Sequence, residues 1–234
     1  MSDFLDTAQA HPEICSVFAQ DDGASMIQTL LLYAPDAFID YDAAQASFDS
    51  PEFLRLLELA KRQTQPEAES PREALLTGQT LLEQLMFGRA QEFEAEYADG
   101  LNELSFPGFP GAGRASFYLT LPMAIPVNAQ EKEGAWAFLM LLITEPLYAA
   151  RSRGGWLPVQ SDFEKKTAAM TDTDAQQLLR ELQAEAVSVF EYDTAVSGIL
   201  ADELPYYFAE EQSAGQIADR IQRRVQLYLE ETRR

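Results

Sequence analysis

The chain has 234 residues, which suits one large domain or two small ones, and its 47% hydrophobic and 11% aromatic residues are enough for a buried core. Its 38 acidic against 17 basic residues give a net charge of −21, which repels phosphate backbones and anionic membranes, so we expect no nucleic-acid partner. With one cysteine, Cys15, and one histidine, His11, the chain can form no internal disulfide and has almost no raw material for zinc sites or for Ser-His or Cys-His catalysis, so we expect no metal, cofactor or catalytic residue.

The first half of the chain alternates between helix and strand patterns. In the segment FDSPEFLRLLELAKRQ, Ser50 is the expected N-cap and Pro51 the first helical residue. The patterns predict, in chain order, a helix at 3–10, a strand at 14–19, a helix at 24–33, a strand at 38–40, the helix after Ser50, a helix at 72–76, a strand at 80–87 and a helix at 91–98.

The second half is mostly helical. The Gly- and Pro-rich stretch 104–114 predicts a short strand that runs into a loop. Then come a strand at 117–127 and helices at 130–143, 163–170, 174–187, 194–208 and from Ser213 to the end. Together these elements predict a helix-rich α/β fold.

The last helix has the clearest signature. Ser213 and Gln216 fit a capping box, and Ile217, Ile221, Val225 and Tyr228 form one apolar stripe at spacings of four, four and three. The apolar run 135–143 is too short to span a bilayer and predicts a buried helix, with Trp136 in the core.

The opening residues, MSDFLDTAQ, carry acids where a secretory signal carries Lys or Arg and an apolar stretch. We therefore expect no signal peptide in this chain, which read literally is cytoplasmic. A chain that begins downstream of a natural start would have the same pattern.

Three places combine the polar and aromatic groups that suit a sugar. Asp21 and Asp22, in a turn between strand and helix, would accept hydrogen bonds from hydroxyls or bind a cation; the alternative is a polar turn with an N-cap. Trp156 follows two glycines and would stack on a sugar ring; the alternative is core packing. Tyr192 lies between Glu191 and Asp193, which also fits a capped helix start.

Four segments in order resemble the extracellular solute-binding proteins of bacterial carbohydrate ABC importers, the group that contains maltodextrin-binding protein. They are FIDYDAAQASFDSPEFLRLLELAK (38–61), LSFPGFPGAGRASFYLTLPMAIPVNAQEKEGAWAFLMLLI (104–143), GGWLPVQSDFEKK (154–166) and ILADELPYYFAEEQSAGQIADRIQRRVQLYLEE (199–231). The last is similar to the terminal helices of the Gram-positive lipoprotein branch, where IQ-x-R-V-x-x-YL-x-E recurs.

The resemblance implies a type II periplasmic-binding-protein-like fold of which this chain covers mostly the C-terminal lobe. Residues 1–117 and 157–234 would form that lobe, and 118–156 an excursion that completes the N-terminal lobe of longer members. The ligand-facing positions would fall at Asp21, Asp22, Phe87, Trp156 and Tyr192.

The function implied is reversible binding of a mono- or oligosaccharide without catalysis, with the membrane permease of an ABC transporter as partner. The full-length parent would be an extracellular lipoprotein on the cell surface. Two alternatives remain open. One is an interaction module that binds no small ligand and self-associates or docks through 118–156; the other is a glycoside-active enzyme with paired carboxylates.

Overall fold

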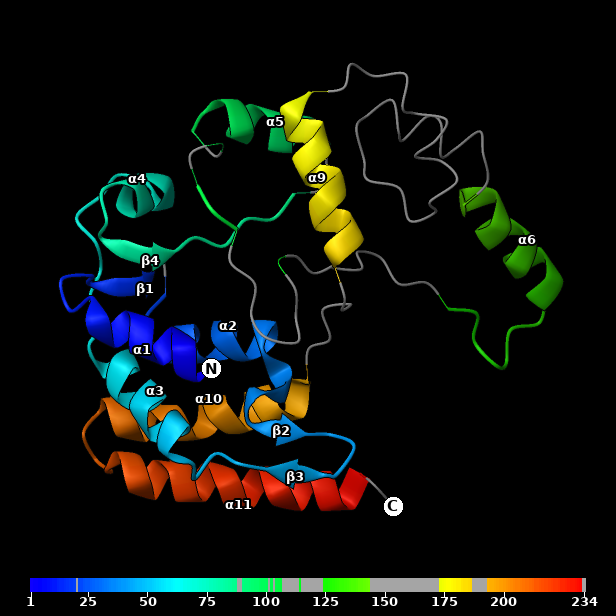
Figure 1. Cartoon of the computed structure of the whole chain (residues 1–234). Helices are drawn as coiled ribbons and strands as arrows, with labels where there is room; N and C mark the ends of the chain where they lie inside the picture. The colour runs from blue at the N-terminus through cyan, green and yellow to red at the C-terminus, as the bar shows by residue number, and fades with distance from the viewer. Residues whose placement is uncertain are drawn as a thin grey trace. The chain divides into compact units, whose positions relative to one another are not determined.

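A computed structural model describes residues 1–19, 21–87, 90–100, 102, 104–106, 114, 124–143, 173–186 and 193–232 (Figure 1). The chain divides into two compact units: unit 1 comprises residues 1–84, 109–113 and 190–234, and unit 2 comprises 85–108 and 114–189. This division differs from the lobe and excursion that the family resemblance implies, and those boundaries stay a prediction.

Unit 1 contains most of the described elements. They are helices α1 (Ser2–Ala10), α2 (Gly23–Tyr33), η1 (Pro35–Ala37), α3 (Pro51–Lys61), α4 (Pro71–Leu76), α10 (Thr194–Phe208) and α11 (Ala214–Thr232), with strands β1 (Ser16–Phe18), β2 (Ile39–Asp40), β3 (Gln45–Ala46) and β4 (Thr80–Leu82). Unit 2 contains α5 (Ala90–Ala98), α6 (Lys132–Ile143) and α9 (Asp174–Glu185).

The described strands form two small sheets. β1 and β4 pair in parallel, with Ser16 opposite Thr80, and β2 and β3 pair antiparallel, with Ile39 opposite Ala46. This helix-rich arrangement with little sheet is compatible with the α/β class expected from the sequence.

Two predicted strands are shorter in the structure. The strand predicted at 14–19 forms only over Ser16–Phe18, and that predicted at 80–87 ends at Leu82. The apolar residues beyond Leu82 have another use, since Leu85 and Phe87 pack into the cluster around Phe93 in unit 2. An apolar run therefore marks burial here without marking a strand.

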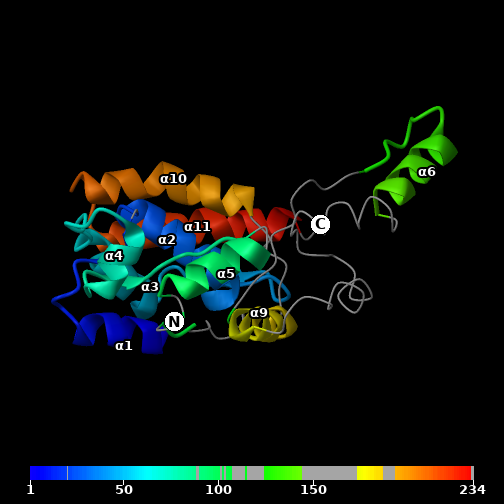
Figure 2. The ribbon, with the colours of Figure 1, turned by 90° about the horizontal axis from the view of Figure 1, so that it is seen from above.

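The core of unit 1 lies between helices from both ends of the sequence. α2 packs on α3 and α10, and α11 packs on α10, α3 and β3 (Figures 1 and 2). At its centre Phe38, Phe48 and Phe53 contact one another with ring centroids 5.0–5.8 Å apart, and all three are essentially fully buried. Ser50 accepts a hydrogen bond from the Phe53 amide, which confirms the predicted cap of α3.

The signature of the last helix is largely confirmed. The Ser213 amide donates to Gln216 Oε1 (2.9 Å) and the Gln216 amide to Ser213 Oγ (3.4 Å), the reciprocal bonds of a capping box. Ile217, Ile221 and Val225 are fully buried, but the stripe continues through Leu229. Tyr228 was predicted in that stripe and is only half-buried, because a neighbouring helix position meets the core at this end.

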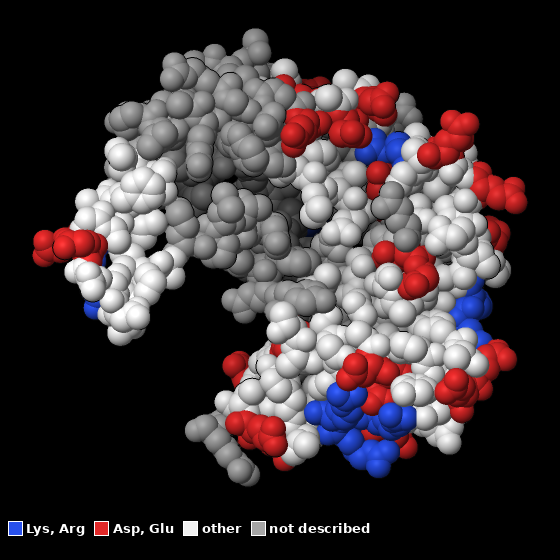
Figure 3. Space-filling view, turned by 180° about the vertical axis from the view of Figure 1, so that it is seen from behind, with Lys and Arg blue, Asp and Glu red and all other residues white. Residues whose placement is uncertain are grey.

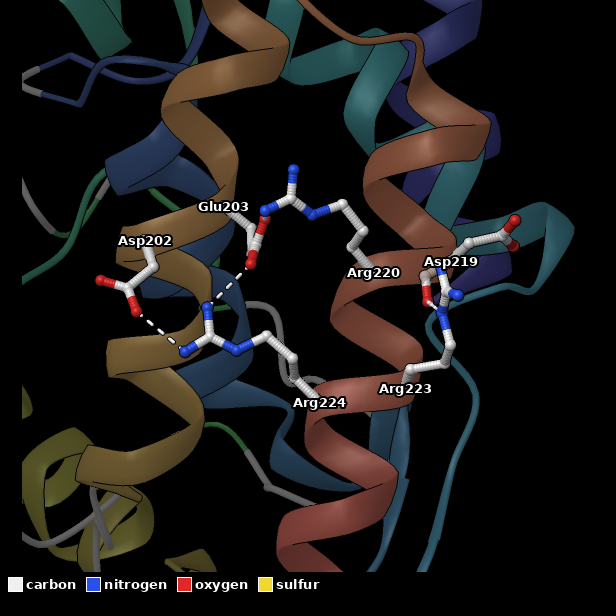
Figure 4. Close-up of polar contacts among 6 residues, drawn as sticks. All are labelled: Asp202, Glu203, Asp219, Arg220, Arg223 and Arg224. Carbon is white, nitrogen blue, oxygen red and sulfur yellow. Dashed lines mark hydrogen bonds and ion pairs between the residues drawn. The ribbon is translucent and has the colours of Figure 1, made fainter.

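A buried carboxylate ties α10 to α11. The Glu203 side chain is 3% exposed, and Arg224 and Arg220 approach its two oxygens at 2.8 Å each. Arg224 also pairs with Asp202 at 2.9 Å (Figure 4). Two guanidinium groups thus compensate a charge that would otherwise be costly to bury. Elsewhere the described surface is rich in Asp and Glu (Figure 3).

In unit 2, α5 packs against α9. Phe93 of α5 is 1% exposed and is buried together with Ala175, Leu179 and Leu182 of α9. At the entry to α9 the Thr173 hydroxyl accepts from the Gln176 amide.

α6 departs from the prediction of a buried helix. Trp136 and Phe138 are each 59% exposed and Leu141 is 52% exposed, so the expected core position of Trp136 is wrong. The helix is apolar on more than one face, and the described part of the chain does not cover these side chains. The apolar run 135–143 predicted a buried helix, but such a pattern carries no information about which residues would cover it.

One glycine allows the close approach of three helices. A Cβ on Gly23, at the start of α2, would lie 2.4 Å from the carbonyl oxygen of Ala60 in α3 and 2.6 Å from the ring of Phe208 in α10. By contrast, a Cβ on Gly198 in α10 would meet no atom within 4 Å.

We therefore predict opposite effects for the same substitution at these two glycines. Gly23→Ala should destabilise unit 1 by about 1–3 kcal/mol, because backbone must move to admit the methyl group. Gly198→Ala should stabilise it by about 0.5–1 kcal/mol, because alanine has the higher helix propensity. Urea unfolding of both variants checks this, and a neutral Gly23→Ala would contradict the packing described here.

Candidate functional site

Polar residues gather where the parallel strands β1 and β4 end. Asp21 and Asp22 follow β1, and Gln84 follows β4. Because the carboxyl ends of parallel strands meet at one edge of a sheet, these residues share that edge, where open α/β sheets bind their ligands. Helix α2 begins here and adds its own side chains.

Asp22 serves mainly as the N-cap of α2. It is exposed, and its Oδ1 accepts a hydrogen bond from the Ser25 amide at 2.7 Å. The pKa of Asp22 is lowered, first by this backbone hydrogen bond and then by the Ser25 hydroxyl. The N-cap that was the alternative for this residue is therefore confirmed.

Asp21 is in a different environment. It is half-buried, and burial raises its pKa from its ordinary value, with an opposing contribution from the Thr29 hydroxyl and a smaller raising one from the charge of Asp22. A carboxylate that is partly withdrawn from water and close to a hydroxyl is suited to exchange hydrogen bonds with a polar ligand.

Thr29 and Tyr33 lie one helical turn apart on α2 and extend this group. Burial raises the pKa of Tyr33 to about 12, opposed by its interaction with Gln84 and supported by the charge of Asp21. These interactions connect Asp21, Thr29, Tyr33 and Gln84, which we call the α2 polar cluster.

The charges of the α2 polar cluster and of the residues next to it in sequence disfavour an anionic ligand. Arg72, on α4, is paired with Glu83 at 2.7 Å, and the two side chains are only 14% and 12% exposed. Glu83 directly precedes Gln84 in the sequence. The Arg72 guanidinium is thus already paired with a carboxylate of the protein. The cluster itself contributes one carboxylate, two hydroxyls and one amide.

The sequence-predicted residues are only partly brought together. Asp21 and Asp22 are adjacent at the β1 edge, whereas Phe87 lies in unit 2, half-buried against Phe93 with ring centroids 5.1 Å apart. Trp156 and Tyr192 lie outside the described residues, so their predicted roles stay predictions.

Beside Tyr192, Asp193 caps α10. Its Oδ1 accepts from the amides of Ala195 and Val196, and its Oδ2 accepts from the Tyr41 hydroxyl at 3.2 Å. Burial, followed by the charge of Asp193, raises the pKa of Tyr41. The capped helix start that was the alternative for this segment is thus confirmed at Asp193.

Sequence reasoning missed Thr29, Tyr33 and Gln84. A usable signal was present, since Thr29 and Tyr33 are spaced i, i+4 on the helix that follows the aspartates. Gln84 offered no such signal, because the strand was predicted to run from 80 to 87. That prediction placed Gln84 inside the strand and not at its carboxyl end.

Among the described residues no group of three or more His, Cys, Asp or Glu side chains is placed to hold a metal ion. Within the same residues, no helix combines the length and apolarity needed to cross a bilayer. A scan against protein-family models finds no match, and no curated protein matches the chain.

The two aspartates should respond to pH in opposite ways. The raised pKa of Asp21 means that its ionised form destabilises the folded state. The contribution of Asp21 to stability therefore falls as the pH rises from its pKa in the unfolded state through its pKa in the folded state. Asp21→Asn should raise the melting temperature at pH 7, and the gain should vanish near about pH 3, where the carboxyl is neutral in both states.

The matched variant Asp22→Ala should lose about 1 kcal/mol at pH 7, the usual cost of removing an N-cap. Because the pKa of Asp22 is lowered, this contribution is present above the unfolded pKa and declines as pH falls through the folded one. Thermal unfolding between pH 3 and pH 7 tests both; parallel pH profiles for the two variants would contradict these environments.

Proposed function

We propose that the chain is a substrate-binding component of an ABC importer, or part of one, that reversibly binds a carbohydrate without chemical conversion. The observation that carries this proposal is the α2 polar cluster at the carboxyl edge of β1 and β4. Its groups are of the kind that bind hydroxyls, and it lies where α/β sheets bind ligands.

The cluster matches the hydrogen bonding of a polyol. Each sugar hydroxyl both donates and accepts; Asp21 is a charge-assisted acceptor, while Thr29, Tyr33 and Gln84 can each donate or accept. Adjacent hydroxyls on one sugar ring could thus contact the carboxylate and the amide together. The net charge of −21 further favours a neutral over an anionic ligand.

The sequence resemblance supports the remaining parts of the proposal. It would give the chain a type II binding-protein fold, a permease as membrane partner and an extracellular position as a lipoprotein in a full-length parent. The resemblance also implies that Trp156, Tyr192 and Phe87 would supply stacking surfaces for the sugar.

Calorimetry against neutral mono- and oligosaccharides tests the function. We expect binding by the wild-type chain, loss of at least tenfold in affinity for Asp21→Ala, and a loss of about three- to tenfold for Tyr33→Phe, the equivalent of one hydrogen bond. Asp49→Ala, an exposed aspartate in the loop between β3 and α3, is the matched control and should bind like wild type. The absence of binding across the whole panel would refute the proposal.

A second candidate is an interaction module without a small ligand, and the exposure of α6 favours it. Trp136, Phe138 and Leu141 are all more than half exposed on one helix, and exposed apolar patches are typical of interaction surfaces. This function predicts concentration-dependent association through α6.

Sedimentation velocity over a range of concentrations separates the two candidates. If α6 mediates association, Trp136→Glu should abolish it, whereas Leu227→Glu, at a residue of similar exposure (56%) on α11, should leave it unchanged. A monomeric wild-type chain at high concentration would exclude self-association as the purpose of α6.

A further inference from the structure

Asp21 is a half-buried carboxylate that no cation of the described residues compensates. The charge that acts on it there is that of Asp22, which is also negative. Glu83, at the end of β4, shows the contrast, because this nearly buried carboxylate has its own cation, Arg72, at 2.7 Å. A carboxylate that is partly withdrawn from water without a counter-charge is favoured by a ligand that supplies one.

The start of α2 does not supply the missing positive charge. The first amides of a helix carry a partial positive charge that favours an anion. Here the Ser25 amide donates to Asp22 Oδ1 at 2.7 Å, and the Met26 amide donates to the Asp22 carbonyl at 2.8 Å. These amides are therefore bonded to Asp22, whereas the Asp21 side chain interacts with the hydroxyl of Thr29.

The groups beside Asp21 can accept the hydrogen bonds that a cationic amine donates. A primary ammonium has three N–H donors and no acceptor. One would bond to the Asp21 carboxylate, and the others to neighbouring oxygens such as the Thr29 hydroxyl. Tyr33 and Gln84 would remain for the hydroxyls of the same ligand. A neutral hydroxyl in place of the ammonium would leave the charge of Asp21 uncompensated.

From this arrangement we propose that the carbohydrate bound at the α2 polar cluster is an amino sugar, whose protonated amine pairs with Asp21. The inference rests on the proposed function and names the substrate class of the same site. A charge-assisted hydrogen bond is stronger than a neutral one, and more so where water is partly excluded. The net charge of −21 also attracts a cationic ligand.

Calorimetry with matched sugars at about pH 6, where a sugar amine is protonated, tests the substrate class. The probes are glucose, galactose and mannose, the corresponding amino sugars, and their N-acetyl forms, which keep the nitrogen without its charge. We expect one amino sugar to bind at least tenfold more tightly than both of its neutral counterparts. If a neutral sugar binds as tightly as every amino sugar, the inference is overturned while the proposed function stands. If no sugar binds, both fail.

An isosteric variant assigns the preference for the amine to Asp21. Asp21→Asn removes the charge, keeps the shape and is expected to fold at least as stably as wild type. It should abolish the preference for the amino sugar and change the affinity for its neutral counterpart by less than about threefold. The matched control, Asp49→Asn, removes one exposed negative charge elsewhere and should keep the preference. Equal losses in the two variants would assign the preference to the overall charge and overturn the role of Asp21.

A polyamine separates an amino sugar from a simple cation. Spermidine carries ammonium groups without a sugar ring, so it can pair with Asp21 but offers no hydroxyls to Tyr33 and Gln84. We expect it to bind at least tenfold more weakly than the preferred amino sugar. Equal or tighter binding of spermidine would overturn the assignment of an amino sugar.

Discussion

The position of α11 is the constraint on which unit 1 depends, and three separate interactions fix it. The buried stripe of Ile217, Ile221 and Val225 sets its rotation about the helix axis. The side-chain amides of Gln222 and Gln226 set its position along that axis, because only one alignment lets both bridge backbone groups of residues 44–48. The paired Glu203 then joins it to α10. Apolar packing alone would fix the rotation of α11, but neither its position along the axis nor its connection to α10.

The α2 polar cluster depends on this framework through α2. Gly23 lets the start of α2 touch the backbone of α3 and the ring of Phe208, so α2 is seated against helices that α11 holds in place. The same seating directs Thr29 and Tyr33 towards Asp21. The hydroxyls of Thr29 and Tyr33 are thus held on a packed helix, which suits a binding site, since less ordering is then required when a ligand arrives.

Local signals in the sequence predicted local structure well. Ser50 with Pro51, the Ser213–Gln216 box and the turn before α2 each depend on neighbours within four residues, and all three formed as expected. Predictions failed where a residue's partner is distant in sequence. Trp136 is apolar but exposed, and the run beyond Leu82 is apolar because it packs near Phe93. Similarly, two aspartates in a turn suggested a site, but which of them is half-buried depends on tertiary packing that no local pattern reports.

The separation in sequence of the segments that build unit 1 has a consequence for its synthesis. The Phe48 amide and Gln222, which bond to each other, are 174 residues apart, and α2 and α3 find their cover on α10 and α11. While the ribosome is still making the intervening residues, the apolar faces of α2 and α3 have no permanent partner. The residues of α2 and α3 therefore lack this cover, and are open to aggregation or to chaperones, until α10 and α11 have been synthesised. Folding of unit 1 thus depends on segments far apart in the sequence, and its rate should be set by closing that long loop.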